Sequence, residues 1–161
     1  MKFFFALLSL SYTLFAQTYN FIELRYSDAI AHYTQLEGKI TFLTDGLEIE
    51  YPKTFKKLHY QNGILSYYEN NDEISLNELQ ANKIMQYFDI LMLLHKGDQN
   101  ELHKMFSVQE SESGKVLQPL GSLQNYIKYI LVRKKHSSLQ YIKIYLQNND
   151  TISITINDKI S

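Results

Sequence analysis

The sequence LHYQNGILSYY, residues 58–68, is typical of an antiparallel β-hairpin. Asn62-Gly63 is the preferred pair for a two-residue type I′ turn, and the residues on both sides of it alternate in polarity. Because residues directly opposite each other share a face, Lys56 should lie opposite Glu69 at the far end. The same register predicts one apolar face made of Leu58, Tyr60, Leu65 and Tyr67.

Two further strands are predicted before this hairpin by the same alternation. Residues 39–42 and 47–51 alternate on either side of the turn signal Asp45-Gly46, and Pro52 ends the second run. Period-2 spacing also places a set of acids, otherwise suggestive of a metal or acid-base site, on a solvated face: Asp45, Glu48 and Glu50.

The opening segment fits two periods. Residues 19–35 match both a helical stripe and a strand alternation, and we expect a short helix or irregular start followed by a strand over residues 29–36. Later in the chain, apolar runs separated by turn residues predict strands over residues 105–110, 116–120, 126–133, 139–147 and 151–157.

A helix is predicted over residues 79–96, where the β-type alternation stops. Ser75 or Asn77 can cap its start, and Gly97 marks its end. Residues 84–94 are apolar on nearly every side, so this helix must be enclosed or must cover something apolar that is not always protein. A second, short helix is expected over residues 99–104.

The last predicted hairpin joins two isoleucine-rich strands, which should share one apolar face. Pairing Leu146 with Ile152 requires a loop of odd length, so we predict a three-residue connection, Asn148-Asn149-Asp150. Its last residue, Asp150, should adopt a left-handed conformation, which Asp tolerates.

The N-terminus predicts export. Lys2 precedes an apolar run over residues 3–14, and Ala16 is suited to signal-peptidase cleavage, which leaves Gln17 first. The run is shorter than the roughly 20 residues of a transmembrane anchor. We therefore expect a cleaved signal peptide over residues 1–16, a periplasmic location, and a single domain over residues 17–161.

No residue set predicts catalysis, and we expect no enzyme activity, cofactor or metal. The five histidines are scattered without ligand spacing, and no nucleophile, phosphate-loop or dinucleotide motif is present. The formal charge of −1 argues against nucleic-acid binding. The chain has no cysteine, which excludes disulfides and lipid attachment at the cleavage site.

Several motifs follow one another in a recognisable order. Tyr33-Thr34-Gln35 closes the first segment, residues 38–42 form a glycine-led strand, and residues 58–68 form a hairpin with a tyrosine-rich return strand. Leu117-Gln118-Pro119 follows the helices, and residues 139–156 form the closing hairpin. Together these segments resemble the periplasmic lipoprotein-carrier family LolA, whose wider relatives include LolB.

This resemblance implies an α+β fold, mainly antiparallel β, in which an incomplete, half-open β-barrel has a helical lid over its concave face. It implies a monomeric carrier that shields the acyl chains of a lipoprotein or lipid between an inner-membrane transporter and an outer-membrane acceptor. Arg25 and Arg133 are the only arginines, and neither falls where the family places the early-strand arginine that ties its lid shut.

Two functions stay open. From the residues alone, an apolar helix more often completes a solid core than roofs a cavity, which favours an exported interaction module whose exposed tyrosines contact a partner protein. The resemblance favours an acyl-chain cavity, and flexible methionines on the helix could pack against protein or lipid. For the second function the predicted lining is Leu58, Tyr60, Leu65, Tyr67, Met85, Phe88, Leu91, Met92, Ile127, Tyr129, Ile144 and Ile154.

Overall fold

The computed structural model describes residues 16–160, so the predicted signal peptide lies outside the described residues apart from Ala16. Two helices, α1 (Glu78–Lys96) and α2 (Gln99–Met105), follow the first half of the strands. The strands are β1 (Gln17–Ser27), β2 (His32–Leu43), β3 (Gly46–Tyr51), β4 (Lys56–Gln61), β5 (Ile64–Glu69), β6 (Asp72–Glu73), β7 (Phe106–Ser111), β8 (Gly114–Pro119), β9 (Ile127–Lys135), β10 (Ser138–Leu146) and β11 (Thr151–Ile160).

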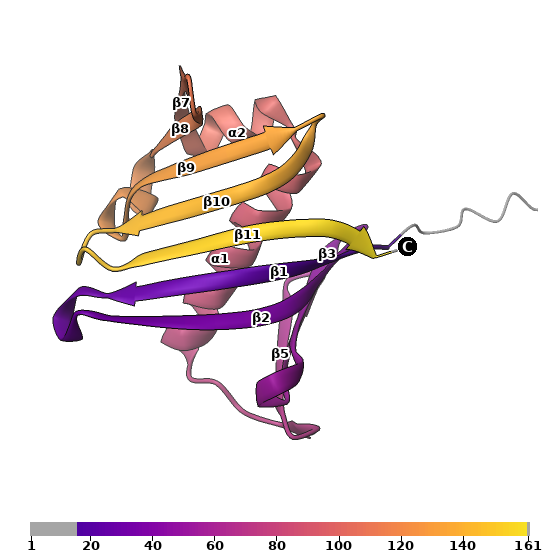
Figure 1. Cartoon of the computed structure of the whole chain (residues 1–161). Helices are drawn as coiled ribbons and strands as arrows, with labels where there is room; N and C mark the ends of the chain where they lie inside the picture. Colours follow the sequence, from indigo (N-terminus) through magenta and orange to yellow (C-terminus); the bar gives the residue numbers. More distant parts are fainter. Residues whose placement is uncertain (1–15, 161) are drawn as a thin grey trace, which may run out of the picture.

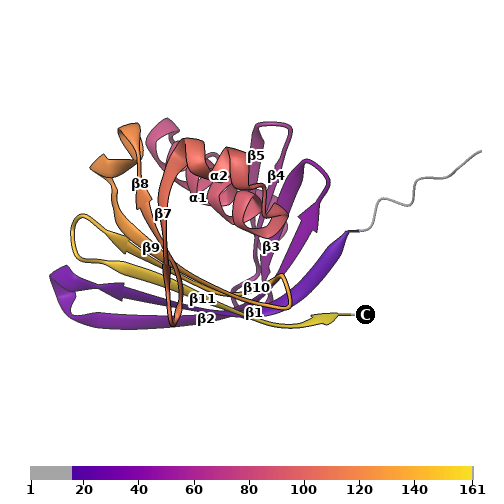
Figure 2. The same cartoon turned by 90° about the horizontal axis from the view of Figure 1, so that it is seen from above.

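All of these strands form one antiparallel sheet in the order β6-β5-β4-β3-β2-β1-β11-β10-β9-β8-β7. Two runs of hairpins are therefore joined edge to edge by the first and last strands (Figure 1). The sheet curves but does not close, and both helices lie in its concave side (Figure 2). The predicted fold class, a mainly antiparallel half-open barrel with a helical cover, is confirmed.

The prediction for the opening segment is wrong. Residues 17–27 form strand β1, a 3-10 turn (Asp28–Ile30) follows, and the next strand begins at His32. The polarity of β1 misleads because Ile22, 36 % exposed, lies on the outer face while Glu23 points inward. Pairing with both β2 and β11 outweighs the local pattern, because a central strand is held by long-range partners on both edges.

The hairpin of residues 58–68 has the predicted register. Tyr60 pairs with Leu65 and Leu58 with Tyr67, and the Lys56 ammonium lies 3.7 Å from the Glu69 carboxylate. A turn of this type fixes the register locally, since both central residues must have positive φ. Asn62 and Gly63 do, at 52° and 79°.

The prediction for the closing hairpin is correct for the shared apolar face and wrong for the position of the loop. Ile144 pairs with Ile152 and Ile142 with Ile154, so the apolar face is shared as predicted. The Leu146 N–H donates to the Asp150 carbonyl at 2.9 Å, which leaves residues 147–149 as the three-residue loop. The predicted loop is thus one residue late, and the left-handed residue is Asn149, at φ 69°, rather than Asp150.

Helix α1 begins and ends at the predicted signals. Asn77 and Gln80 form a reciprocal capping box, and Gly97 ends the helix with a left-handed φ of 70°. The middle of α1 is buried against the sheet through Phe88, Ile90, Leu91 and Leu94. Within the described range of 16–160, no helix is both long and apolar enough to cross a bilayer.

His95, in the last turn of α1, predicts a pH dependence of stability. Its ring stacks on Phe42 of β2, with centroids 3.7 Å apart and planes 5° apart. Burial lowers the pKa of His95, and the positive charge of Lys134 lowers it further. Folding therefore favours the neutral ring, whose stabilising contribution is complete above about pH 6.5 and is lost as the pH falls from there through the lower folded pKa.

We expect the thermal unfolding midpoint to fall between about pH 7 and pH 5, and to fall less in His95→Phe, which keeps the stacked ring without the titrating group. Differential scanning calorimetry across this range measures both proteins. An identical pH dependence in the variant would contradict this role for His95.

Candidate functional site

A first cavity beneath α1 lies against strands β9, β10 and β11, and its volume is about 400 Å³. Its deep wall is apolar and consists of Ile90, Ile127, Ile144, Leu146 and Ile152. Its outer part is polar and solvent-exposed, and consists of Lys83, Gln86, Asn125, Gln147 and Asn148. One ammonium group and four side-chain amides therefore line the entrance, and the interior of the cavity is apolar.

The second cavity lies on the other side of the sheet centre, against strands β1 to β5, and has a volume of about 260 Å³. Its wall is mainly apolar and aromatic, with Leu36, Tyr51, Leu58, Tyr67, Ile84 and Phe88. Arg25 and Lys56 also line it, and both side chains reach solvent. Tyr87 lines both cavities, because it projects from α1 toward the strand between them.

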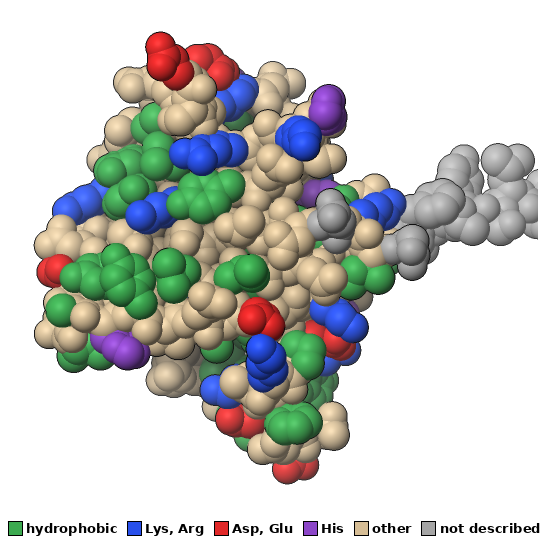
Figure 3. All heavy atoms as spheres, viewed as in Figure 1, with side chains coloured by type: hydrophobic (Ala, Val, Ile, Leu, Met, Phe, Trp, Pro, Cys, Tyr) green, Lys and Arg blue, Asp and Glu red, His purple; other side chains and the backbone are tan. Residues whose placement is uncertain are grey.

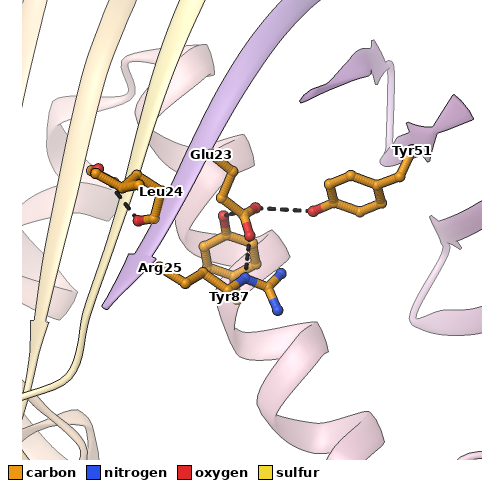
Figure 4. Close-up of polar contacts among 6 residues, drawn as sticks. Glu23, Leu24, Arg25, Tyr51 and Tyr87 are labelled. Carbon is orange, nitrogen blue, oxygen red and sulfur yellow. Dashed lines mark hydrogen bonds and ion pairs between the residues drawn. The ribbon is translucent and has the colours of Figure 1, made fainter. Parts of the chain in front are cut away.

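A buried carboxylate lies between the two cavities. Glu23 of β1 has no solvent exposure, and its Oε2 accepts hydrogen bonds from the hydroxyls of Tyr51, at 2.9 Å, and Tyr87, at 3.5 Å. Arg25 Nε donates to the other oxygen, Oε1. Figure 4 shows the two phenols approaching the carboxylate from β3 and from α1. The cluster ties the helix to the centre of the sheet.

The electrostatics of this cluster keep its donors protonated. Burial raises the pKa of both Tyr51 and Tyr87, and the negative charge of Glu23 raises them further. For Arg25 burial acts in the opposite direction, but the attraction to Glu23 outweighs it and raises the pKa. Both phenols therefore remain hydrogen-bond donors and Arg25 remains a cation across the physiological pH range.

The predicted lining residues are divided among five environments. The first cavity is lined by Ile127 and Ile144, and the second by Leu58, Tyr67 and Phe88. Three others are buried in the packed core away from both cavities: Tyr60, Leu91 and Ile154. Three are partly buried and pack against that core: Leu65, Met85 and Met92.

The prediction for Tyr129 is wrong, because Tyr129 lies in a fifth environment, the outer face of the sheet. Ile130 and Ile144 pair on the inner face, so the neighbouring pair of Tyr129 and Tyr145 lies on the outer face, with rings 4.2 Å apart. Simple alternation would place Ile127 and Tyr129 on one face, but the register of β9 shifts between them. The extra residue turns Tyr129 outward while Ile127 stays inside.

The central cluster of Glu23, Tyr51 and Tyr87 was not predicted from the sequence. Glu23 and Arg25 alternate with Ile22, Leu24 and Tyr26, a pattern that favours the polar pair as the solvated face. The one available signal was the helix itself: Tyr87 places a hydroxyl in an otherwise apolar stretch, and a buried phenol needs a partner. A carboxylate on the facing strand is such a partner.

In the part of the chain that the structure describes, no group of three or more His, Asp and Glu side chains is arranged to hold a metal ion. Every buried side-chain nitrogen or oxygen within that part has a hydrogen-bond partner. The wall of the first cavity offers apolar surface with polar groups at its entrance, an arrangement that suits non-covalent binding of an apolar guest.

The arrangement defines a class of protein: an open antiparallel sheet whose concave face is covered by helices over apolar cavities. No protein-family model matches the chain, and no curated protein matches it. Among solved structures, it is similar to a domain from Vibrio parahaemolyticus assigned as an outer membrane lipoprotein-sorting protein. The TM-score is 0.40 and the identity 10 %, over 90 % of this chain and 84 % of that one. At this level the similarity identifies neither family nor function.

Proposed function

We propose that this protein is a periplasmic carrier that shields the acyl chain of a lipid or lipoprotein during transfer toward the outer membrane. The first cavity supports this function most directly, because a volume of about 400 Å³ lies within the range of pockets that bind small ligands. Its wall of isoleucine and leucine would exclude water from an acyl chain, and each buried methylene would gain about 0.8 kcal/mol. The protein would need no cofactor and perform no reaction.

The entrance supports the same function. Lys83 and the amides of Gln86 and Asn125 can hydrogen-bond a carboxylate, ester or phosphate group that stays outside while the chain enters. A guest with a polar head and an apolar tail therefore matches both parts of the cavity. The donor and acceptor of such a guest would be membrane complexes, as in lipoprotein transfer between two membranes.

Filling the first cavity tests this proposal. In Ile152→Trp the indole would occupy the space that an acyl chain needs, and we expect affinity for a fluorescent fatty acid to fall at least about tenfold. Ile30→Trp is the matched control, since Ile30 is 71 % exposed and lines neither cavity. Native mass spectrometry of protein purified from the periplasm would show bound lipid in the control but not in Ile152→Trp. Equal lipid content and affinity in both variants would contradict the cavity as the binding site.

A second candidate function is that of an interaction module, which the outer face of β9 and β10 supports. Lys143 lies over the Tyr145 ring at 4.9 Å, and Arg133 over Tyr141 at 5.2 Å. Figure 3 shows hydrophobic and cationic side chains interleaved on this side of the molecule. In this case the core would be dry in solution, lipid would be absent from native mass spectra, and Ile152→Trp would change no binding property.

A further inference from the structure

We propose that Tyr87, held against β1 by Glu23, is a partition between the two cavities and limits the length of acyl chain that the first cavity accepts. This inference rests on the proposed function, since it concerns the same guest. It assigns a specificity role to a residue of α1 and to the carboxylate that fixes it.

The partition follows from the order of the strands. The first cavity is lined by β9, β10 and β11, and the second by β1 to β5. In the sheet β1 lies between β11 and β2, so the boundary between the cavities runs along β1. Arg25 of β1, which lines the second cavity, pairs directly with Ile152 of β11, which lines the first. The Tyr87 ring lines both spaces, and its hydroxyl meets Glu23 on β1.

Glu23 fixes the ring at this boundary. Its carboxylate is fully buried, and with Arg25 on one oxygen and Tyr51 on the other it cannot rotate away freely. The hydroxyl of Tyr87 is thereby held at the centre of the sheet, across the path from one cavity to the other. A chain that fills the first cavity from its polar entrance would end against this ring.

Removing the ring should join the cavities. The second space, about 260 Å³, is roughly two-thirds as large as the first, about 400 Å³, so the longest chain accommodated should grow by a similar fraction. Affinity should rise about fourfold with each methylene that becomes buried. In the wild type this rise should stop at the length that fills the first cavity, and in Tyr87→Ala it should continue to longer chains.

The experiment is a titration of the purified full chain with saturated fatty acids of increasing length, with displacement of a fluorescent fatty acid as the readout. Tyr126→Ala is the matched control, because it removes an aromatic ring from the first cavity and from no part of the second. Tyr87→Phe keeps the ring but removes the hydroxyl that Glu23 holds, so its length limit should lie between those of the wild type and Tyr87→Ala. If Tyr87→Ala does not fold by circular dichroism, Tyr87→Leu shortens the side chain while keeping apolar contacts, and provides the same comparison.

The expected result is a length limit that moves furthest in Tyr87→Ala or Tyr87→Leu, moves less in Tyr87→Phe, and stays in the wild type and Tyr126→Ala. Binding with the same length limit in all variants would overturn the partition and leave the proposed function intact. A wild type that binds no acid of any length would overturn the proposed function and the partition together.

Discussion

Glu23→Ala is expected to lower the free energy of unfolding by about 3 kcal/mol, because the Glu23 carboxylate is fully buried. The substitution leaves the buried hydroxyls of Tyr51 and Tyr87 without their acceptor and opens a void at the centre of the sheet. Arg25 loses its partner too, but its side chain is 51 % exposed and water can replace the contact. Urea denaturation followed by circular dichroism measures the change.

Glu37→Ala is the control for this prediction. Glu37 lies on the neighbouring strand β2 and pairs with Lys53 at 2.8 Å, but both side chains are largely exposed, so the loss should stay below about 1 kcal/mol. Glu23→Gln keeps an acceptor oxygen, so its loss of unfolding free energy should lie between the losses of the two alanine variants. Equal stability losses for Glu23→Ala and Glu37→Ala would show that the buried cluster does not stabilise the fold.

Leu91→Ala is expected to cost about 2–5 kcal/mol, because Leu91 is fully buried at the middle of α1. It lines neither cavity, so the folded fraction should bind acyl chains as the wild type does. Leu79→Ala provides the comparison on the same helix: Leu79 is 62 % exposed, and its loss should change stability by less than about 0.5 kcal/mol. Reduced acyl-chain affinity per folded Leu91→Ala molecule would show that the cavity extends to this position.

The hairpins were predictable because their information is local. Asn62-Gly63 specifies a turn, the turn specifies the register, and alternation then assigns each residue to a face. In the closing hairpin the face was again correct, but the loop was misplaced by one residue, because either Asp or Asn can take the left-handed position there. Strand β1 was not predictable in this way, since its partners are β2 and β11 and its outer face carries the more apolar residues.

The candidate site was harder to predict than the fold. Alternation identifies inward-facing residues, but it cannot tell which of them touch empty space. Ile90 and Leu91 are neighbours on α1 and both are buried, yet Ile90 lines a cavity and Leu91 does not. The difference depends on how the helix crosses the curved sheet, which is a property of the whole assembly rather than of any segment.

The pairing of β1 with β11 has a consequence for the route of folding. Strands β1 to β6 can form in sequence order, as can β7 to β10, yet the two runs share no backbone ladder until β11 arrives. Thr18 pairs with Ile160, so this contact spans almost the full described chain, and a loop of that size closes slowly. Before β11 pairs with them, β1 and β10 each expose an edge of unpaired backbone N–H and C=O groups, to which a non-native strand can bind. Early pairing of β11 with both strands would remove those two edges.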